Sequence, residues 1–437
     1  MKSLLPARRP RILTLSMLAC ATLASPIALS AGAADAQSVT QSVPAPPQSQ
    51  QITLEEAIRR ANAASPLGEA TAARMDALAA GRAAADTRPA ASIDVTAENF
   101  GIGGQDLNRQ IQVTGAYSQR IERGGKREAR VGVAEAQIGV AQAEALVKRL
   151  DIAARVQLLY VDVQAAEAQI QIARERVTIA EQLAREVGRR VTDARDPLFA
   201  GTRTRTQLAE AKVDLELAEH ERDAKLSRLV SLWGGSPAGL SVTSGAFLTV
   251  SEASLPTDPS PVDLAVFEAR RRQASAELAL QRANARTDPT ISGGPRIIGT
   301  GDVALVAGFS LPLSNGALNR ANIARAEADG RQVEADYAVA LFEWRQQVAI
   351  AAERVTEAAH EVDAIRDRVV PGAQRTLAEV RAGYNRGGFT FMDVSMAQTA
   401  LHDAYARLVR AATRYHQARV EFDRLTGRFA TLTQETK

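Results

Sequence analysis

A long helical pattern occurs twice in this chain, about 192 residues apart, and each time it follows a pair of short strand patterns. In the first copy, apolar residues over 156–191 alternate at spacings of three and four, which is the seam of a coiled coil. Seven apolar residues over 348–369 each lie 192 positions after a member of that seam. Gly124 and Gly316, just before the two long helices, differ by the same number. This agreement predicts a duplicated unit.

The chain opens with a segment that is typical of a secretory signal peptide. A basic start is followed by an apolar stretch over 12–33 and by an Ala-Asp-Ala triplet that ends at Ala36 and fits a cleavage site. We therefore predict that residues 1–36 are a signal peptide and that the mature chain begins at Gln37. Two alternatives stay open, an uncleaved membrane anchor and a lipid attached to Cys20.

The leader also accounts for the charge of the chain. Its four basic residues and one acidic residue make up the whole net charge of +3 at pH 7. The mature chain is then neutral overall, so no nucleic-acid partner is expected. It also contains no cysteine and needs no disulfide. Residues 37–51 are rich in Gln, Ser and Pro and predict a flexible lead-in. No later apolar run reaches eighteen residues, which argues against a membrane-spanning helix.

Each copy predicts the same order of elements: a helix, two strands, a long helix and a shorter return helix. A long helix of about 68 residues would span roughly 100 Å, which is deeper than any soluble core. In the first copy the predicted elements are a helix over 53–87 interrupted at Pro66, strands over 92–100 and 110–121, a long helix over 126–193 and a return helix that ends at Gly234.

The second copy predicts helix 261–287, strands 290–298 and 302–313, helix 317–382 with an interruption at Pro371, and a return helix over 390–427. A short strand is expected near 248–251, between the copies. The predicted domains are a first repeat at 52–234, an inter-repeat (equatorial) segment at 235–259, a second repeat at 260–427 and a C-terminal tail at 428–437.

The four strands alternate apolar and polar residues, so each has one apolar face. Four strands of this length cannot close a barrel alone, and an open edge in lipid is prohibitively costly. Three copies would supply twelve strands and a lumen. We therefore predict a mainly α fold with a small β part that closes as a trimeric twelve-stranded β-barrel on an α-helical barrel. The candidate lipid-facing residues are Ile93, Val95, Ile111, Val113, Val303, Leu305, Phe309 and Leu311.

The two helix-to-helix turns are the candidate functional positions, since in a closed tube they form the rim farthest from the strands. In the first turn, Asp196 is predicted to cap the return helix and Pro197 to occupy its first turn. The second turn contains Gly387 and Gly388. Thr390 and Asp393 follow at capping-box spacing.

Asp393 has two interpretations: a helix cap, or one member of a ring of carboxylates that attracts cations or pairs with basic groups to hold the rim shut. Arg203 and Arg205, near the start of the first return helix, are its candidate partners. Met392 and Met396 flank Asp393 and are interpreted as packing or docking residues, with contact to a soft metal ion as the alternative.

Catalytic and cofactor signatures are absent from the sequence. The four histidines are scattered along helices without carboxylates or cysteines at metal-ligand spacing. No nucleophile triad, paired-carboxylate or dinucleotide pattern stands out. We expect no resident metal, no cofactor and no enzymatic activity.

Three segments resemble a known family: IERGGKREARVGVAEAQ at 121–137, GGFTFMD at 387–393 and YHQARVEFDRLTG at 415–427. They are similar to TolC-type outer-membrane efflux proteins, particularly the cobalt-zinc-cadmium branch. The resemblance covers about 52–427. It implies a homotrimer in the lipid of the cell outer membrane, with a helical tube in the periplasm docked to a periplasmic adaptor protein and an inner-membrane pump of the RND type. It also implies an entrance narrowed by two aspartates, of which Asp393 matches the first while Met396 replaces the second.

The expected function is a passive exit duct in a tripartite efflux system, and the resemblance alone favours heavy-metal cations as its cargo. Export of organic compounds and secretion of polypeptides through the same duct are alternatives. A rival from another class is a periplasmic coiled-coil scaffold outside any membrane, which would have polar residues on both strand faces.

Overall fold

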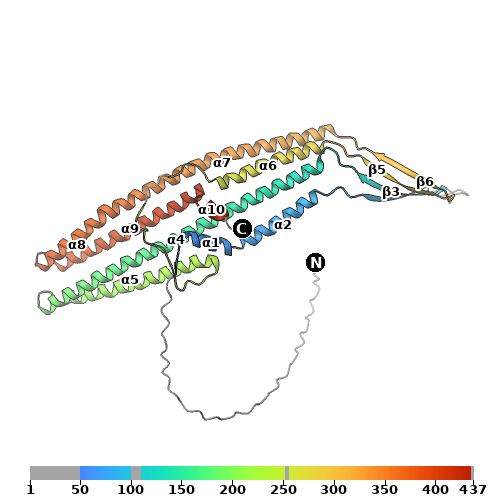
Figure 1. Ribbon diagram of the computed structural model, residues 1–437. Coiled ribbons are helices and arrows are strands. Elements are labelled where there is room, and N and C mark those ends of the chain that lie inside the picture. Colours follow the sequence, from blue (N-terminus) through green and yellow to red (C-terminus); the bar gives the residue numbers. More distant parts are fainter. Residues whose placement is uncertain (1–49, 100–109, 251–254, 435–437) are drawn as a thin grey trace, which may run out of the picture. The chain divides into compact units, whose positions relative to one another are not determined.

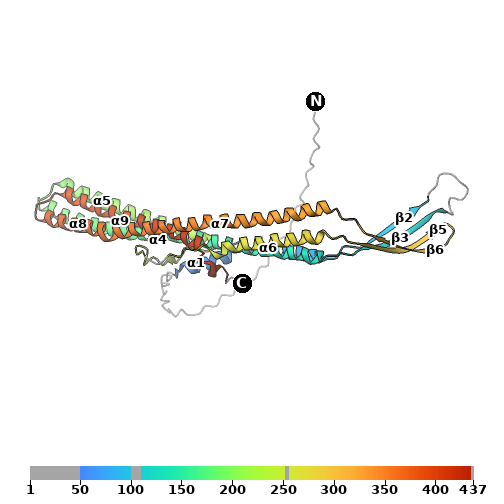
Figure 2. The ribbon, with the colours of Figure 1, turned by 90° about the horizontal axis from the view of Figure 1, so that it is seen from above.

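Figure 1 shows a computed structural model of the chain, which describes residues 50–99, 110–250 and 255–434. The predicted signal peptide, its cleavage site and Cys20 lie outside these residues. The described residues belong to one compact unit. In this unit, long helices run side by side, and the strands β2, β3, β5 and β6 extend from one end of them (Figures 1 and 2).

The predicted duplication is present in the order of elements. The first repeat contains α1 (Leu54–Ala64), α2 (Leu67–Ala85), β2 (Ser92–Glu98), β3 (Gln112–Arg120), α4 (Lys126–Thr192), α5 (Leu198–Val230) and a 3-10 turn (Ser231–Trp233). The second contains α6 (Pro261–Asn284), β5 (Thr290–Ile298), β6 (Val303–Ser310), α7 (Gly316–Ala364), a π-helical segment (Ile365–Val369), α8 (Val370–Asn385), α9 (Phe391–Thr426) and α10 (Ala430–Gln434).

The long helices agree closely with the prediction. Helix α4 has 67 residues, and α7, the π-helical segment and α8 follow one another without a break from Gly316 to Asn385. The predicted interruption at Pro371 takes the form of the π-helical turns just before it, because proline has no N–H for the regular helical hydrogen bond. The two apolar seams are buried at equivalent positions: Val156 is 0% exposed and Val348 is 1% exposed.

Strands β2, β3, β5 and β6 form one antiparallel sheet in that order. The pairing of β3 with β5 joins the two repeats and is interrupted where Gly115 lies opposite Pro295, which has no N–H to donate. Beside this point a Cβ on Gly294 would meet the carbonyl oxygen of Gly115 at 1.8 Å, so only glycine fits.

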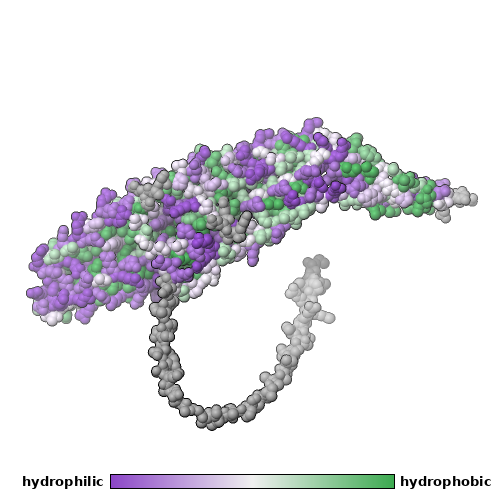
Figure 3. Space-filling model, viewed as in Figure 1, coloured by the Kyte–Doolittle hydropathy of each residue, from purple (hydrophilic) through white to green (hydrophobic). Residues whose placement is uncertain are grey.

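The register places the large apolar residues of the four strands on one face of the sheet, except Ile298 and Val306. Ile93 lies opposite Tyr117, and Phe309 opposite Ile291. Figure 3 shows the hydrophobic surface of this end of the molecule. Of the predicted lipid-facing residues, Ile111 and Leu311 lie just outside β3 and β6, and the other six lie within strands. Ile93, Val95, Val113, Val303, Leu305, Phe309 and Leu311 are all exposed large hydrophobic residues in the single chain.

Two predictions about short segments are wrong. The strand between the repeats is β4 (Leu240–Val242), not residues 248–251, of which the described part is turn and coil. The last two residues of the predicted flexible lead-in are not flexible. Gln50 and Gln51 belong to β1 (Gln50–Ile52), which pairs in parallel with β4. A tertiary contact fixes this pair: the hydroxyl of Tyr160 donates to the carbonyl of Ile52 and accepts from the backbone N–H of Thr243, both at 3.0 Å.

The core between the long helices runs as separate apolar clusters along them, and the three largest are filled by residues from both repeats or from the terminal segments. In the middle of the molecule, Phe247 of the inter-repeat segment is 3% exposed and belongs to the largest cluster. Its ring stacks on His416, whose Nε2 lies 2.9 Å from the carbonyl oxygen of Phe247. The segment between the repeats is thereby fixed to α9.

In the described part of the chain, none of the helices combines the length and the apolar character that crossing a bilayer requires.

Candidate functional site

The two helical hairpins end in tight turns that lie at the same end of the helices, opposite the sheet (Figures 1 and 2). The first turn connects α4 to α5, and the second connects α8 to α9. These are the turns that the sequence singled out, and the structure brings them together.

A cluster of three polar side chains joins the two turns. Arg190 Nε donates to Asp196 Oδ2 at 2.9 Å, and its Nη1 donates to the carbonyl oxygen of Tyr384 at 3.3 Å. The hydroxyl of Tyr384 donates to the same carboxylate of Asp196. The guanidinium of Arg190 also stacks on the Tyr384 ring, 4.3 Å from its centre. Arg190 and Asp196 belong to the first repeat and Tyr384 to the second, so the cluster ties one hairpin tip to the other.

The environment of this cluster keeps it in one protonation state near neutral pH. Burial alone would raise the pKa of Asp196, but hydrogen bonds from Arg190 and Tyr384 outweigh it and lower the pKa. Burial, and then the hydrogen bond to Asp196, raise the pKa of Tyr384. Asp196 is therefore ionised and Tyr384 neutral over a wide pH range.

The prediction that Asp196 caps α5 is wrong. Pro197 is the residue that precedes the helix, and it makes no side-chain cap. The carboxylate of Asp196 instead binds Arg190 and Tyr384. Local spacing could not reveal this, since Tyr384 lies 188 residues away in sequence.

The second turn depends on its glycines. Gly387 has a φ of +83°, a left-handed conformation that side chains disfavour. Gly388 donates its N–H to the carbonyl of Gly383 at 2.9 Å and closes the turn. A Cβ on Gly383 would meet the Phe389 ring at 2.1 Å, so the aromatic ring lies directly on the helix backbone.

Asp393 forms the capping box that its spacing indicates. Its backbone N–H donates to Thr390 Oγ1 at 3.3 Å, and its Oδ2 accepts from the Thr390 N–H at 2.8 Å and from the Thr390 hydroxyl at 2.7 Å. These hydrogen bonds lower the pKa of Asp393. The role of Asp393 as a cap is thus established by geometry, while its role in a ring between copies stays a prediction.

The other predicted tip residues lie at the surface. Arg203 stacks over the ring of Phe391, 5.9 Å from its centre, and Arg205 Nε donates to the carbonyl of Gly201 at 3.1 Å. Within the described chain, neither arginine forms an ion pair with Asp393, so any such pairing would have to join different copies. Met392 and Met396 are 46% and 64% exposed on the first turns of α9.

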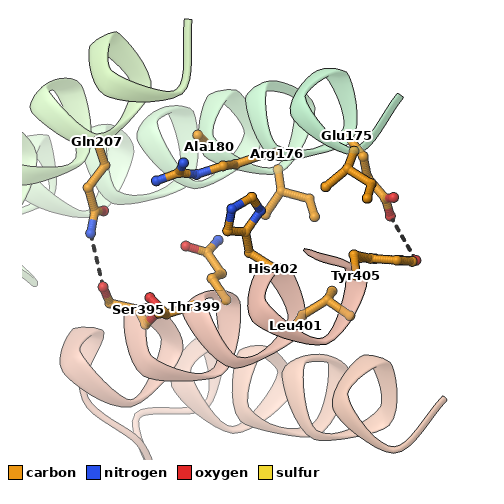
Figure 4. Close-up of a pocket in the computed structure, with 12 residues that line it drawn as sticks. Glu175, Arg176, Ala180, Gln207, Ser395, Thr399, Leu401, His402 and Tyr405 are labelled. Atoms are coloured by element: carbon orange, nitrogen blue, oxygen red, sulfur yellow. Dashed lines mark hydrogen bonds between the residues drawn. The ribbon is translucent and has the colours of Figure 1, made fainter. Parts of the chain in front are cut away.

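Sequence reasoning missed a cavity of about 100 Å³ between α4, α5 and α9, lined by both polar and apolar side chains (Figure 4). Two hydrogen bonds flank it, from Gln207 Nε2 to Ser395 Oγ at 2.9 Å and from the Tyr405 hydroxyl to Glu175 Oε1 at 3.3 Å. His402 projects between the helices in the middle of the cavity. Each of these side chains belongs to a regular helical pattern in the sequence. No local spacing therefore predicts the cavity.

The cavity has the chemistry of a hydrated space. The side-chain atoms Gln207 Oε1 and Gln398 Nε2 are buried at its wall without a hydrogen-bond partner in the described chain. Burial, and then the positive charge of Arg176, lower the pKa of His402, so its imidazole is neutral at pH 7. A neutral imidazole and free amide groups can hold water molecules, which would satisfy the amide atoms.

The described residues contain no group of three or more histidine, cysteine, aspartate or glutamate side chains placed to hold a metal ion.

A model of a family described as outer membrane efflux protein matches residues 57–235 and 260–428, which together make up most of the chain. The chain belongs to the outer membrane efflux protein family. Its members are passive channel components rather than enzymes, and the two matched segments contain the two hairpins whose tips are described above.

A known resistance protein also resembles this chain. The cobalt-zinc-cadmium resistance protein CzcC of Cupriavidus metallidurans is 26% identical over 265 residues, which are 57% of this chain and 61% of that relative. The match therefore spans less than two thirds of the relative.

Among solved structures, a crystal structure of CusC has a TM-score of 0.66 at 16% identity, covering 87% of this chain and 96% of that one. The outer membrane protein VceC of Vibrio cholerae has a TM-score of 0.63 at 18% identity, covering 85% and 95%. The outer-membrane channel OprN has a TM-score of 0.63 at 15% identity, covering 85% and 89%. These similarities establish that the single chain has the predicted mainly helical fold with a small sheet.

Proposed function

We propose that this chain is the outer-membrane duct of a tripartite efflux system. It assembles as a homotrimer with the sheet in the outer membrane and the helices in the periplasm. A periplasmic adaptor and an RND-type inner-membrane pump bind at the hairpin tips and supply the energy. The cargo proposed is heavy-metal cations.

The sheet is the observation that carries this proposal. One face carries exposed apolar side chains on all four strands, including Ile93 and Leu305 at 79% and 86% exposed. The other face carries Asp94, Thr114 and Arg296, and Arg296 Nε donates to Thr114 Oγ1 at 2.9 Å. One apolar and one polar face suit a wall between lipid and water. The same pattern disfavours a periplasmic scaffold, which would be wetted on both faces.

The open edges of the sheet support assembly from several copies. Strands β2 and β6 each pair on one side only within the four-stranded sheet. In lipid, every unpaired N–H and C=O group of such an edge costs several kcal/mol, so closure by other copies is required. Three copies provide twelve strands, enough for a lumen.

The cargo is proposed from the likeness to the cobalt-zinc-cadmium resistance protein. The tips themselves add no support for cation selection. The carboxylates of Asp196 and Asp393 already accept hydrogen bonds from Arg190 and Thr390, and the neighbouring Arg203 is exposed. Cargo selection is therefore assigned to the pump, and organic compounds stay the second candidate because an unselective duct would pass them equally well.

The assembly is tested by the electrophoretic mobility of the protein from membrane fractions, with and without heating. A heat-dissociable trimer in the outer-membrane fraction is expected. A monomer in the soluble periplasmic fraction would overturn the duct and favour the scaffold.

The cargo is tested by deleting the gene and measuring growth with zinc, cobalt and cadmium salts and with a panel of organic toxicants. Loss of metal tolerance alone, restored by the wild-type gene, is the expected result. Sensitivity to the organic panel alone would indicate that organic compounds, not metal cations, are the cargo.

A further inference from the structure

Basic side chains gather where the sheet joins the helices. Strands β2 and β5 begin at this end of the sheet, and β3 and β6 end there. The residues that connect these strands to the helices, together with the adjoining strand and helix ends, are 86–91, 119–130, 285–289 and 311–320, and we call them the junction. The junction contains eight basic and four acidic side chains, a net charge of +4, although the predicted mature chain is neutral.

The acidic side chains of the junction already have basic partners within the chain. The pairs are Asp288 with Lys126 at 2.7 Å, Glu122 with Arg130, and Arg127 with Asp86 at 3.5 Å and with Glu128 at 3.8 Å. Five exposed arginines of the junction form no ion pair in the described chain: Arg88, Arg120, Arg123, Arg286 and Arg320. The positive charge of the junction is therefore available to an anionic partner.

Exposed apolar side chains lie beside these arginines. Ile121 and Leu311 directly follow β3 and β6 and are 42% and 44% exposed, and Leu313 is 94% exposed. Figure 3 shows hydrophilic residues at the ends of the helices beside the hydrophobic surface of the strands. An apolar face that ends at a row of long cationic side chains matches the boundary between the acyl chains and the charged headgroups of a bilayer.

The junction also contains a hollow of about 500 Å³ between the segment before β2 and the start of α4. Arg88 and Arg127 contribute to its wall. Gln119 and Ile121 line it as well, and the alternation along β3 places both on the apolar side of the sheet. A water molecule takes about 30 Å³ in the liquid, so the hollow has room for a hydrated phosphate group.

We propose that the junction binds the headgroups of anionic phospholipids in the leaflet next to the helices. The proposal rests on the duct proposed above, which sets the sheet in the bilayer, and it adds the class of lipid that the duct prefers. Guanidinium groups bind phosphate oxygens through paired, charge-assisted hydrogen bonds. A zwitterionic headgroup binds less well, because its ammonium group needs acidic partners and the four acids of the junction are already paired.

The arginines of the junction do not all contribute equally. Arg120 is paired in register with Thr290, and the alternation along β5 places Thr290 on the polar face with Arg296. In the proposed duct this face is turned to the water-filled lumen. Arg88, at the wall of the hollow, and Arg123, in the turn before α4, are assigned to the headgroups instead.

The proposal is tested with the wild-type protein reconstituted in phosphatidylcholine vesicles that contain a small share of spin-labelled lipid. Electron paramagnetic resonance gives the fraction of label that the protein immobilises, measured for labelled phosphatidylglycerol and for labelled phosphatidylcholine. We expect a roughly fivefold preference for phosphatidylglycerol at low salt. In about 1 M sodium chloride, where the screening length is about 3 Å, the preference should fall toward one. Equal association of the two lipids at low salt would overturn the proposal, and this comparison needs no variant.

Two variants locate the site. Arg88→Gln combined with Arg123→Gln should lose most of the preference. The matched control is Arg407→Gln combined with Arg410→Gln, which removes the same charge from two exposed arginines of α9. Arg120→Gln is the control for the face of the sheet. Both controls should keep the preference, and a loss in either as large as in the first variant would contradict a lipid site at the junction.

Inorganic phosphate distinguishes a lipid surface from a site for free phosphate. Added at the same ionic strength as sodium chloride, it should lower the preference no more than the chloride does. A larger fall would assign the arginines to soluble phosphate and overturn the lipid proposal. The duct fails by a different result: a wild-type chain that forms no trimer in vesicles contradicts the duct, whereas a trimer without lipid preference contradicts only the junction site.

Discussion

The middle of the molecule and the hairpin tips both hold charged side chains that join the two repeats, but they hold them differently. In the middle, Arg424 of α9 donates two hydrogen bonds to Asp263 of α6, at 2.7 and 3.0 Å, and one at 2.6 Å to Asp151 of α4 in the other repeat. Asp423 accepts from Arg419, Arg428 and Gln157 at 2.9 to 3.0 Å. The side chains of Asp263 and Asp423 are only 2% and 1% exposed.

At the tips, the joining cluster is closer to water. The side chain of Arg190 is 18% exposed and that of Asp196 is 11% exposed. Breaking a buried pair leaves a charge without solvent, whereas a charge at the tip can be hydrated as soon as the hairpins separate. From this difference we expect the middle to hold the repeats in fixed register and the hairpins to part at the tips.

The largest expected effect is in the middle. Asp423→Ala removes the shared acceptor of Arg419, Arg428 and Gln157, and should lower the free energy of unfolding by about 3 kcal/mol. Urea unfolding followed by circular dichroism measures it. The matched control is Asp151→Ala, because Asp151 binds Arg424 from a side chain 57% exposed and should cost under about 0.5 kcal/mol. Equal losses in the two variants would erase the distinction between buried and exposed pairs.

A smaller loss is expected at the tips. Tyr384→Phe removes the hydroxyl that donates to Asp196 and should cost about 1.5 kcal/mol, since Arg190 still binds that carboxylate. It should also raise the open probability in single-channel recordings, because the hydroxyl is one of the bonds between the hairpins.

Tyr405→Phe is the control for Tyr384→Phe, since that hydroxyl bonds to Gln374 and Glu175 well away from the turns. If both variants change conductance alike, the tip cluster does not hold the hairpins together.

Removing the cap on α9 should cost less stability than either change above. Thr390→Ala removes the hydroxyl that accepts from the Asp393 N–H and should cost about 1 kcal/mol of stability. Asp393→Asn keeps a side-chain acceptor for the Thr390 N–H and should cost less. If Asp393 is only a cap, conductance and its block by divalent cations should be unchanged in Asp393→Asn. Altered block would restore the carboxylate ring between copies.

The response to acid should also differ between the two regions. Burial lowers the pKa of His416, although the hydrogen bond to the Phe247 carbonyl opposes this. A lowered histidine pKa stabilises the fold above the unfolded value of about 6.5, and that stability is lost as the pH falls toward the folded value. Unfolding at pH 7.5 and pH 5.5 should show a loss of at most about 1.4 kcal/mol per pH unit. His416→Asn should reduce this loss, and the part that remains is assigned to His402, whose pKa burial also lowers.

The tip cluster should be indifferent over that same interval. The lowered pKa of Asp196 contributes stability above its unfolded value of about 3.9, which is lost only as the pH falls through the folded value. The raised pKa of Tyr384 contributes stability below about pH 10, which is lost as the pH rises through the folded value. Conductance that changes between pH 5 and pH 8 would place another titrating group at the tips.

The linear order of residues was sufficient for the long helices and for the four strands of the larger sheet. The bounds of α4 and the four strands of the sheet follow from periodicities of 3.5 and 2, which are properties of neighbouring residues. The capping box of Asp393 is also local, because Thr390 is three residues away. The duplication was visible because its two copies keep the same spacing.

What the sequence could not supply are the partners of polar side chains that lie far apart along the chain. Asp196 was assigned to a cap because its partner Tyr384 lies in the other repeat, and β4 was misplaced because its pairing partner β1 begins the described chain. His402, Gln207 and Glu175 surround one cavity although they come from three helices. Such contacts depend on how the hairpins pack against each other. Packing is decided by shape and burial along the whole length of the helices, which no local spacing encodes.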